Sequence, residues 1–280
     1  MLLTFLSDYG YDDEFAGACR AVIARFAPEA RVVDLTHGIA PGDLRRGALA
    51  LEAAVERSGP AVHLAVVDPG VGTDRRALAV AAGESFLVGP DNGLLTLAAE
   101  RLGGVAGAWD ISRTPLRLEP VAPTFHGRDI FAPVAAHLAS GRPPDAAGVA
   151  IDPESLTGLG LPVPVHQGDV LVAHVLYADR FGNLVLDARP PDLVAGVRES
   201  KREADKPVRR AEAGPAARLT IEVAGREFAA TRGRSFAEGE EGVVVYDDSS
   251  GRVGIAVDRG SAAELLEAGR DDEIRLAARR

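Results

Sequence analysis

The first hundred residues alternate short apolar runs with helical stretches, and this order constrains the fold more than any other feature of the sequence. Strands that alternate with helices are typical of an α/β layer with a largely parallel central sheet. We therefore predict an α/β N-terminal domain. Its expected elements are strands at 2–6, 30–35, 61–67, 77–82 and 85–89, and helices at 12–27, 43–57 and 93–102.

The sequence changes character around residues 162–164, which read Pro-Val-Pro. Short strand-like runs separated by Gly, Asp and Pro follow, with little helical periodicity, and this pattern predicts a smaller C-terminal antiparallel β-barrel domain. The predicted domains are therefore residues 1–161 and 165–280. The charged, apolar-poor segment 198–215 is expected to be a solvated loop, with a role in binding a partner as the alternative.

Composition excludes several classes of protein. The chain has 280 residues, a formal net charge of −10 and a sequence pI near 5.2, so we expect no attraction to nucleic acid or to an anionic membrane surface. The single cysteine, Cys19, cannot form an internal disulfide. No apolar run approaches the ~20 residues of a membrane-spanning helix, and the N-terminus has no basic leader, so we expect a cytoplasmic protein.

Polar residues follow several of the predicted strands. In open α/β sheets the ligand crevice lies beyond the carboxyl ends of the strands, so these residues are expected to meet there. In "SDYGYDDEFAG", Asp8 follows the first strand and Asp13 precedes the next helix. This pattern has two interpretations. Either the acidic residues serve only to cap the helix, or Asp8 accepts hydrogen bonds from ribose hydroxyls and Asp13 faces a cation.

A second strand runs into "VVDPGVGTDRR" at residues 66–76. Pro69 favours an extended backbone at Asp68, and the glycines that follow let the chain turn away, which leaves Asp68 at the rim of the sheet. Arg75 can fold back across such a turn and pair with this carboxylate. The local pattern fits a structural ion pair as well as an aspartate aimed at a substrate.

Three further segments carry candidate chemistry. His126 in "TFHGRD" lies just before a helix, where an imidazole is available for proton transfer, although a lone histidine is often structural. Asp179, Phe181 and Asn183 in "YADRFGNL" occupy alternate positions and can share one face, although a hairpin turn explains them too. The backbone groups of the hairpin predicted at 247–262 can bind a flat base, although hairpin formation alone also explains its small residues.

Taken together, these segments resemble the S-adenosyl-L-methionine (SAM) hydroxide adenosyltransferases, also called SAM hydrolases, of the fluorinase–chlorinase superfamily. The resemblance covers nearly the whole chain, and its markers are "SDYG", "VVDPGVGT-D-RR", "GPDNGLLT", "TFHGRD", "FGN" and "SSG-V-IAV". It implies the two domains described above and a homotrimer whose substrate lies between neighbouring subunits. It also implies hydrolysis of SAM to adenosine and L-methionine, with SAM as substrate and no cofactor or metal.

The resemblance assigns roles to individual residues. Asp68, Arg75 and His126 match the catalytic set of the family. The residues implied in substrate binding are Asp8 for the ribose, Asp13 and Asp179 for the methionine ammonium, Asn183 for the adenine, Phe125 and Phe181 as pocket walls, and Ser249 and Val257 as further contacts.

The chemistry of the reaction fits these residues. A sulfonium is already a good leaving group, so the reaction needs an in-line water near C5′ and an acceptor for its proton. The hypothesis is that Asp68 and His126 orient the water and take its proton, while Arg75 fixes Asp68. A halide nucleophile would be repelled by an ionised carboxylate. By position, Asp68 and Gly127 replace a tyrosine and a serine of the fluorinase, which favours water.

Three alternatives stay open at this point: a SAM-dependent halogenase, a calcium-dependent nucleoside hydrolase and a non-catalytic regulator that binds adenosine or SAM. The acidic run at 8–14 is similar to the calcium site of nucleoside hydrolases, a chemistry that gathers several carboxylates on one metal. A regulator would bind its ligand without forming product.

Overall fold

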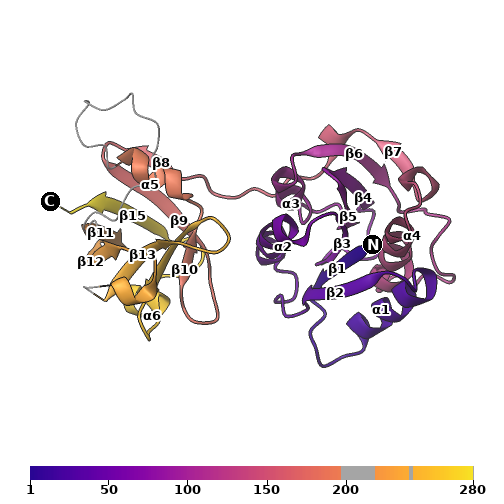
Figure 1. Cartoon of the computed structure of the whole chain (residues 1–280), viewed down its shortest axis with the longest axis horizontal. Helices are drawn as coiled ribbons and strands as arrows, with labels where there is room; N and C mark the ends of the chain where they lie inside the picture. Colours follow the sequence, from indigo (N-terminus) through magenta and orange to yellow (C-terminus); the bar gives the residue numbers. More distant parts are fainter. Residues whose placement is uncertain (197–217, 240–241, 280) are drawn as a thin grey trace. The chain divides into compact units, whose positions relative to one another are not determined.

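A computed structural model describes residues 1–196, 218–239 and 242–279 (Figure 1). The chain divides into two compact units, Met1–Leu159 and Gly160–Arg280, and each has its own hydrophobic core. The domain limits of 1–161 and 165–280 remain predictions. The charged segment 198–215, expected as a surface loop, lies outside the described residues.

The first unit is an α/β layer. Its sheet has the strand order β2-β1-β3-β5-β4-β6-β7, with parallel pairing from β2 to β5 and antiparallel pairing from β5 to β7. The predicted α/β fold is therefore confirmed. The elements are β1 Leu2–Ser7, α1 Phe15–Phe26, β2 Arg31–Thr36, α2 Leu44–Ser58, β3 Ala61–Val66, β4 Ala77–Ala82, β5 Ser85–Pro90, α3 Thr96–Arg101, β6 Val105–Asp110, the π-helical turn η1 Gly127–Phe131, α4 Ala132–Ala139, the 3-10 turns η2 Pro144–Ala146 and η3 Pro153–Ser155, and β7 Val149–Ile151.

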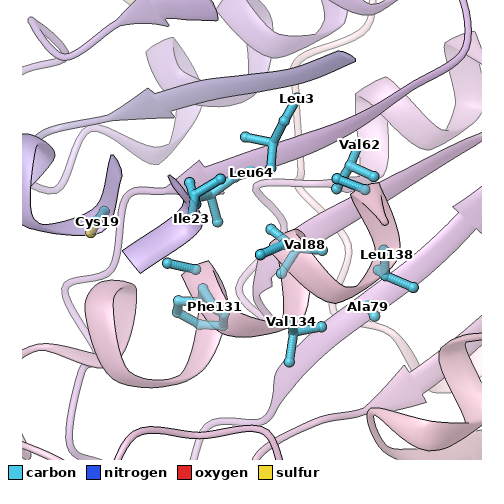
Figure 2. Packing of buried hydrophobic residues seen from close by; sticks show 14 of the residues in the cluster. Leu3, Cys19, Ile23, Val62, Leu64, Ala79, Val88, Phe131, Val134 and Leu138 are labelled. Carbon is cyan, nitrogen blue, oxygen red and sulfur yellow. The ribbon is translucent and has the colours of Figure 1, made fainter. Parts of the chain in front are cut away.

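Helices cover both faces of this sheet. In Figure 1, α1 and α4 lie on one side of the strands and α2 and α3 on the other. Figure 2 shows the core on the α1 and α4 side, where Phe131 and Val134 pack with sheet residues such as Leu64 and Val88. Strand β3 is buried along its whole length, as expected for a central parallel strand with helices on both faces.

The second unit is a closed β-barrel with the strand order β10-β14-β13-β12-β11-β15-β9, and β9 pairs again with β10. Its pairings are antiparallel except that β12 and β13 run parallel, among the strands described. The predicted barrel is confirmed. The elements are β8 Val165–Gln167, β9 Val170–Ala178, β10 Leu184–Leu186, α5 Pro190–Gly196, β11 Arg218–Val223, β12 Arg226–Arg232, the 3-10 turn η4 Phe236–Glu238, β13 Val243–Asp247, β14 Val253–Val257, α6 Ala262–Leu266 and β15 Glu273–Ala278.

The pairing of β1 with β3 brings the candidate site together. These strands are parallel neighbours, and Ser7 at the end of β1 is in register with Val66 at the end of β3. The backbone N–H of Asp8 donates to the carbonyl of Val66 at 3.3 Å. Asp8 and Asp68 therefore leave the same edge of the sheet. Among the helices described, none is long and apolar enough to cross a membrane.

Candidate functional site

A pocket opens at the carboxyl ends of β1 and β3. Its lining includes Asp8 and Tyr9 from the first strand end, Asp68 from the second, and His126 and Gly127 from the start of η1. The prediction that polar strand ends of this unit meet is therefore confirmed for Asp8 and Asp68. The loop before η1 brings the imidazole of His126 to the two carboxylates.

Asp68 and Arg75 form a forked ion pair. The Arg75 Nε lies 2.9 Å from Oδ1 and 3.1 Å from Oδ2 of Asp68, and Nη2 donates to Oδ2. Both side chains are largely shielded from solvent, with exposed fractions of 6% for Asp68 and 11% for Arg75. A fork of this kind fixes the carboxylate in orientation as well as position. The predicted pairing is thus present, and its carboxylate, that of Asp68, lines the pocket.

His126 is joined to the same guanidinium. Nη2 of Arg75 lies 3.0 Å from Nδ1 of His126. Since a guanidinium only donates, Nδ1 must accept, and the neutral imidazole then carries its proton on Nε2. Burial lowers the pKa of His126 below its ordinary value, and the positive charge of Arg75 lowers it further. We therefore expect a neutral His126 with Nε2–H as its donor.

Asp8 is anchored by the loop before α2. Its Oδ2 accepts a hydrogen bond from the backbone N–H of Gly42 at 2.8 Å. Burial raises the pKa of Asp8, and the negative charge of Asp68 acts in the same direction, while the hydrogen bond from Gly42 opposes the shift. A strand-end carboxylate held in this way can accept hydrogen bonds from vicinal hydroxyls.

Gly72 lets the Asp68 loop contact the His126 loop. Its φ is +79°, and a Cβ at this position would lie 2.7 Å from the carbonyl oxygen of Pro123. A side chain would meet backbone there, not the end of a flexible side chain. Glycine at position 72 therefore allows the close approach that puts Arg75 beside His126.

Gly72→Ala should lower the free energy of unfolding by more than the strain of a left-handed backbone alone, which is about 1–2 kcal/mol. Gly141→Ala is the matched control, because Gly141 has a φ of +75° but no heavy atom within 4 Å of where a Cβ would lie. Urea unfolding of both variants measures the difference. Equal destabilisation of the two would contradict a tight contact between the loops.

Aromatic side chains pack around Tyr9, which lines the pocket, whereas Phe125 is not among the lining residues. Phe125, predicted as a pocket residue, stands edge-on to Tyr9 at 5.8 Å and to Phe15 at 5.3 Å, and Arg128 lies over its ring at 4.8 Å. Tyr9 lines the pocket, and sequence reasoning did not single it out. Its only signal was its position directly after Asp8 at the end of a predicted strand.

Asp13 is not among the residues that line the pocket. It is exposed on the segment before α1. The structure of this unit thus brings Asp8, Asp68, Arg75 and His126 together, but not Asp13. A role for Asp13 in binding an ammonium group stays a prediction.

In the second unit, Asp179 organises the turn between β9 and β10. Its carboxylate accepts from the backbone N–H of Phe181 at 2.8 Å and of Asn183 at 2.9 Å, and from Nδ2 of Asn183 at 2.8 Å. These bonds are those of a hairpin turn. Phe181 is 71% exposed, whereas Asn183 is buried. The turn therefore presents a ring to solvent, and the binding roles of the three residues stay predictions.

The two remaining predicted residues, Ser249 and Val257, belong to β13, β14 and the turn between them, and these strands follow β10 in the sheet. Ser249 is exposed in the turn after β13, and Val257 ends β14, the strand that pairs with β10. Tyr246 on β13 has its pKa raised to about 12 by burial first, with the charges of Asp248 and Asp179 adding to the shift. The phenol of Tyr246 thus stays protonated as a hydrogen-bond donor.

No cluster of three or more His, Cys, Asp or Glu side chains suited to holding a metal ion is found within residues 1–196, 218–239 and 242–279. Asp12, Asp13 and Glu14, which precede α1, are exposed. The arrangement of the first unit instead offers a carboxylate, a guanidinium and an imidazole in contact, beside a second carboxylate.

Comparison with known proteins identifies relatives along the whole chain. A protein from Salinispora tropica named (R)-S-adenosyl-L-methionine hydrolase is 44% identical over 277 residues, which cover 99% of this chain and 97% of that protein. A protein named fluorinase from Actinoplanes is 27% identical and covers 69% of this chain and 73% of its own length. A crystal structure of an uncharacterised conserved protein from Thermotoga maritima superposes with a TM-score of 0.85 at 32% identity, covering 98% of this chain and 99% of that one.

Two family models also match. Residues 3–148 match the SAM hydroxide adenosyltransferase N-terminal domain, and residues 173–275 match the SAM hydroxide adenosyltransferase C-terminal domain. The two matches fall in the α/β unit and the barrel unit respectively. The chain therefore belongs to the SAM hydroxide adenosyltransferase family.

Proposed function

We propose that this protein hydrolyses S-adenosyl-L-methionine to adenosine and L-methionine. The observation that carries the proposal is that Arg75 bonds to both Asp68 and His126, and that these two residues line one pocket with Asp8. The name of the Salinispora relative, an (R)-S-adenosyl-L-methionine hydrolase, supports the same reaction.

The reaction is a displacement at C5′ of the substrate. Water attacks C5′ opposite to sulfur, a C5′–O bond forms, and the C5′–S bond breaks with its electron pair going to sulfur. The sulfonium becomes the neutral thioether of methionine, so the leaving group needs no proton. One proton leaves the attacking water, and the protein must orient that water and accept the proton.

The three contacting side chains divide this work. Asp68 is the proton acceptor, because its oxygens keep acceptor sites beyond those that Arg75 uses. Arg75 holds the carboxylate and the imidazole in a fixed relation. His126, whose Nδ1 accepts from Arg75, directs Nε2–H and so orients the water by donating to its oxygen. This refines the sequence hypothesis, in which His126 also drew off the proton.

The other predicted residues bind the substrate in this proposal. Asp8 accepts hydrogen bonds from the ribose hydroxyls, supported by its place in the pocket. The family resemblance supports the remaining roles, which are the methionine ammonium for Asp13 and Asp179, the adenine for Asn183, pocket walls for Phe125 and Phe181, and further contacts for Ser249 and Val257.

The family resemblance also supports a homotrimer, in which the N-terminal domain of one copy and the C-terminal domain of its neighbour share each substrate. Light scattering would give the mass of three 29.2 kDa chains, and any other mass would contradict the trimer. A cytoplasmic location stays a prediction from sequence. No cofactor is proposed, because the sulfonium already supplies the leaving group.

The test is incubation of the protein with SAM in water, with and without excess chloride, followed by chromatography. Adenosine and methionine in equal amounts are expected in both samples. 5′-Chloro-5′-deoxyadenosine as the main product would favour a halogenase, and binding without product would favour a regulator. A third sample contains EDTA, and activity that survives there would exclude a calcium-dependent nucleoside hydrolase.

A further inference from the structure

The hydroxyl of Tyr9 occupies the space of a side chain at position 127. A Cβ built on Gly127 would lie 1.9 Å from the Tyr9 oxygen and 3.0 Å from the ring carbon that bears it. Both residues line the pocket with Asp68 and His126. Glycine at 127 therefore makes room for the phenol, and the phenol forms this part of the pocket wall.

Three aromatic rings hold the Tyr9 ring in place. Phe5 and Phe125 stand edge-on to it, with centroids at 6.4 Å and 5.8 Å, and Phe15 is tilted against it at 5.9 Å. Rings packed in this way prefer edge-to-face geometry at these separations. The hydroxyl therefore cannot swing away from Gly127 unless the whole ring moves.

The hydroxyl is available to a molecule in the pocket. The Tyr9 backbone N–H donates to Ser7 at 3.3 Å, but within the described parts of the chain no hydrogen bond to the phenol oxygen is found. Burial raises the pKa of Tyr9 well above its ordinary value, and the charges of Asp8 and Asp68 add to this shift. The group is thus a neutral phenol, and a buried hydroxyl is stabilised when a pocket molecule bonds to it.

We propose that the Tyr9 hydroxyl binds the attacking water and completes its hydrogen bonds. The inference rests on the proposed hydrolysis. A water that attacks C5′ uses one lone pair for the new bond, receives His126 Nε2–H on the other, and gives one hydrogen to Asp68. Its second hydrogen then needs an acceptor, and the Tyr9 oxygen supplies one. That hydrogen stays on oxygen and becomes the 5′-hydroxyl hydrogen of adenosine.

The neutral state of the phenol suits this role. A phenolate would compete with Asp68 for the proton of the water, whereas a neutral phenol accepts only a hydrogen bond. Tyr9 would therefore act on the position of the water and not on the strength of the base. Removal of its hydroxyl should lower kcat and leave the binding of SAM nearly unchanged.

Tyr9→Phe should lower kcat for adenosine release about tenfold, the effect expected for one lost hydrogen bond, with the KM for SAM changed less than about twofold. Tyr11→Phe is the matched control. Tyr11 is 69% exposed, and its hydroxyl bonds to Thr36 and to the backbone of His37 outside the pocket lining. We expect near-normal turnover in that variant. Normal kcat in Tyr9→Phe would overturn the proposal.

A second variant tests the contact with position 127. Gly127→Ala should displace the phenol and lower kcat, and the double variant Tyr9→Phe with Gly127→Ala should be no slower than the slower single variant. Losses that multiply would mean that the two residues act independently, which would overturn the proposal.

The wild-type protein separates this inference from the proposed function. If the wild type releases no adenosine from SAM, the hydrolase proposal fails, and the role of Tyr9 fails with it. If the wild type is active and Tyr9→Phe is equally active, only the role of Tyr9 fails. Thermal unfolding of each variant, matched to the wild type, shows that a lower kcat is not a loss of folded protein.

Discussion

Asp68→Asn should lower the rate of adenosine release from SAM by about a thousandfold while the protein stays folded. Removal of a general base typically costs a factor of 10²–10⁴, and an amide of nearly the same shape cannot accept the proton of the attacking water. The amide oxygen can still accept from Arg75, so the loop should keep its conformation. Single-turnover assays with SAM measure the rate, and circular dichroism measures folding.

Asp74→Asn is the control for Asp68→Asn. Asp74 lies on the same loop, six residues further along, but is exposed and outside the pocket lining. We expect near-normal turnover for this control. A folded Asp68→Asn protein with a near-normal rate would contradict the assignment of Asp68 as the proton acceptor and would leave Asp68 as a structural partner of Arg75.

Arg75→Met should lower turnover about a hundredfold and move the acid limb of the pH profile to higher pH. The rate falls because Asp68 and His126 lose the group that holds them together. The limb moves because the Arg75 charge helps to lower the pKa of His126, whereas the Asp68 charge raises it. Without Arg75, the pKa of His126 rises, and the cationic imidazole, which opposes binding of a sulfonium, persists to higher pH.

Two measurements check the Arg75→Met prediction. The pH dependence of kcat/KM gives the acid limb, and NMR titration of the imidazole gives the pKa of His126 directly. Arg75→Lys is the matched variant, because it keeps the charge but loses the planar fork. It should be slow, with its acid limb near that of the wild type. An unchanged His126 pKa in Arg75→Met would contradict the proposed electrostatic link.

Local sequence patterns predicted most of the first unit. The apolar runs at 2–6 and 61–67 became β1 and β3, and the stretch 43–57 became α2, whose N-cap Asp43 accepts from the Arg46 N–H at 3.1 Å. These elements follow from local causes, which are apolar runs, turn residues and capping. The antiparallel addition of β4, β6 and β7 was not predicted, because strand direction depends on partners distant in the sequence.

The candidate site was predicted only in part, because some of its contacts also join residues that are distant in the sequence. Asp68 and Arg75 lie seven residues apart on one turn, so sequence reasoning could pair them. The contact of Arg75 with His126 spans 51 residues, and here the family resemblance pointed to the set before the structure gave its geometry. The fit of the Tyr9 hydroxyl over Gly127 left no signal in the sequence, because it depends on how β1 and η1 pack.

The sequence by itself determined most strands and helices of the first unit, the barrel class of the second, the turn that carries Asp68 and Arg75, and the family. These depend on residues close together in the chain or on motifs that need no coordinates. Only the tertiary structure decided that Arg75 bonds to both Asp68 and Nδ1 of His126, that Asp13 lies outside the pocket, and that Tyr9 lines it. Such contacts arise from parallel strand pairing and close loop packing, which join residues far apart in the sequence.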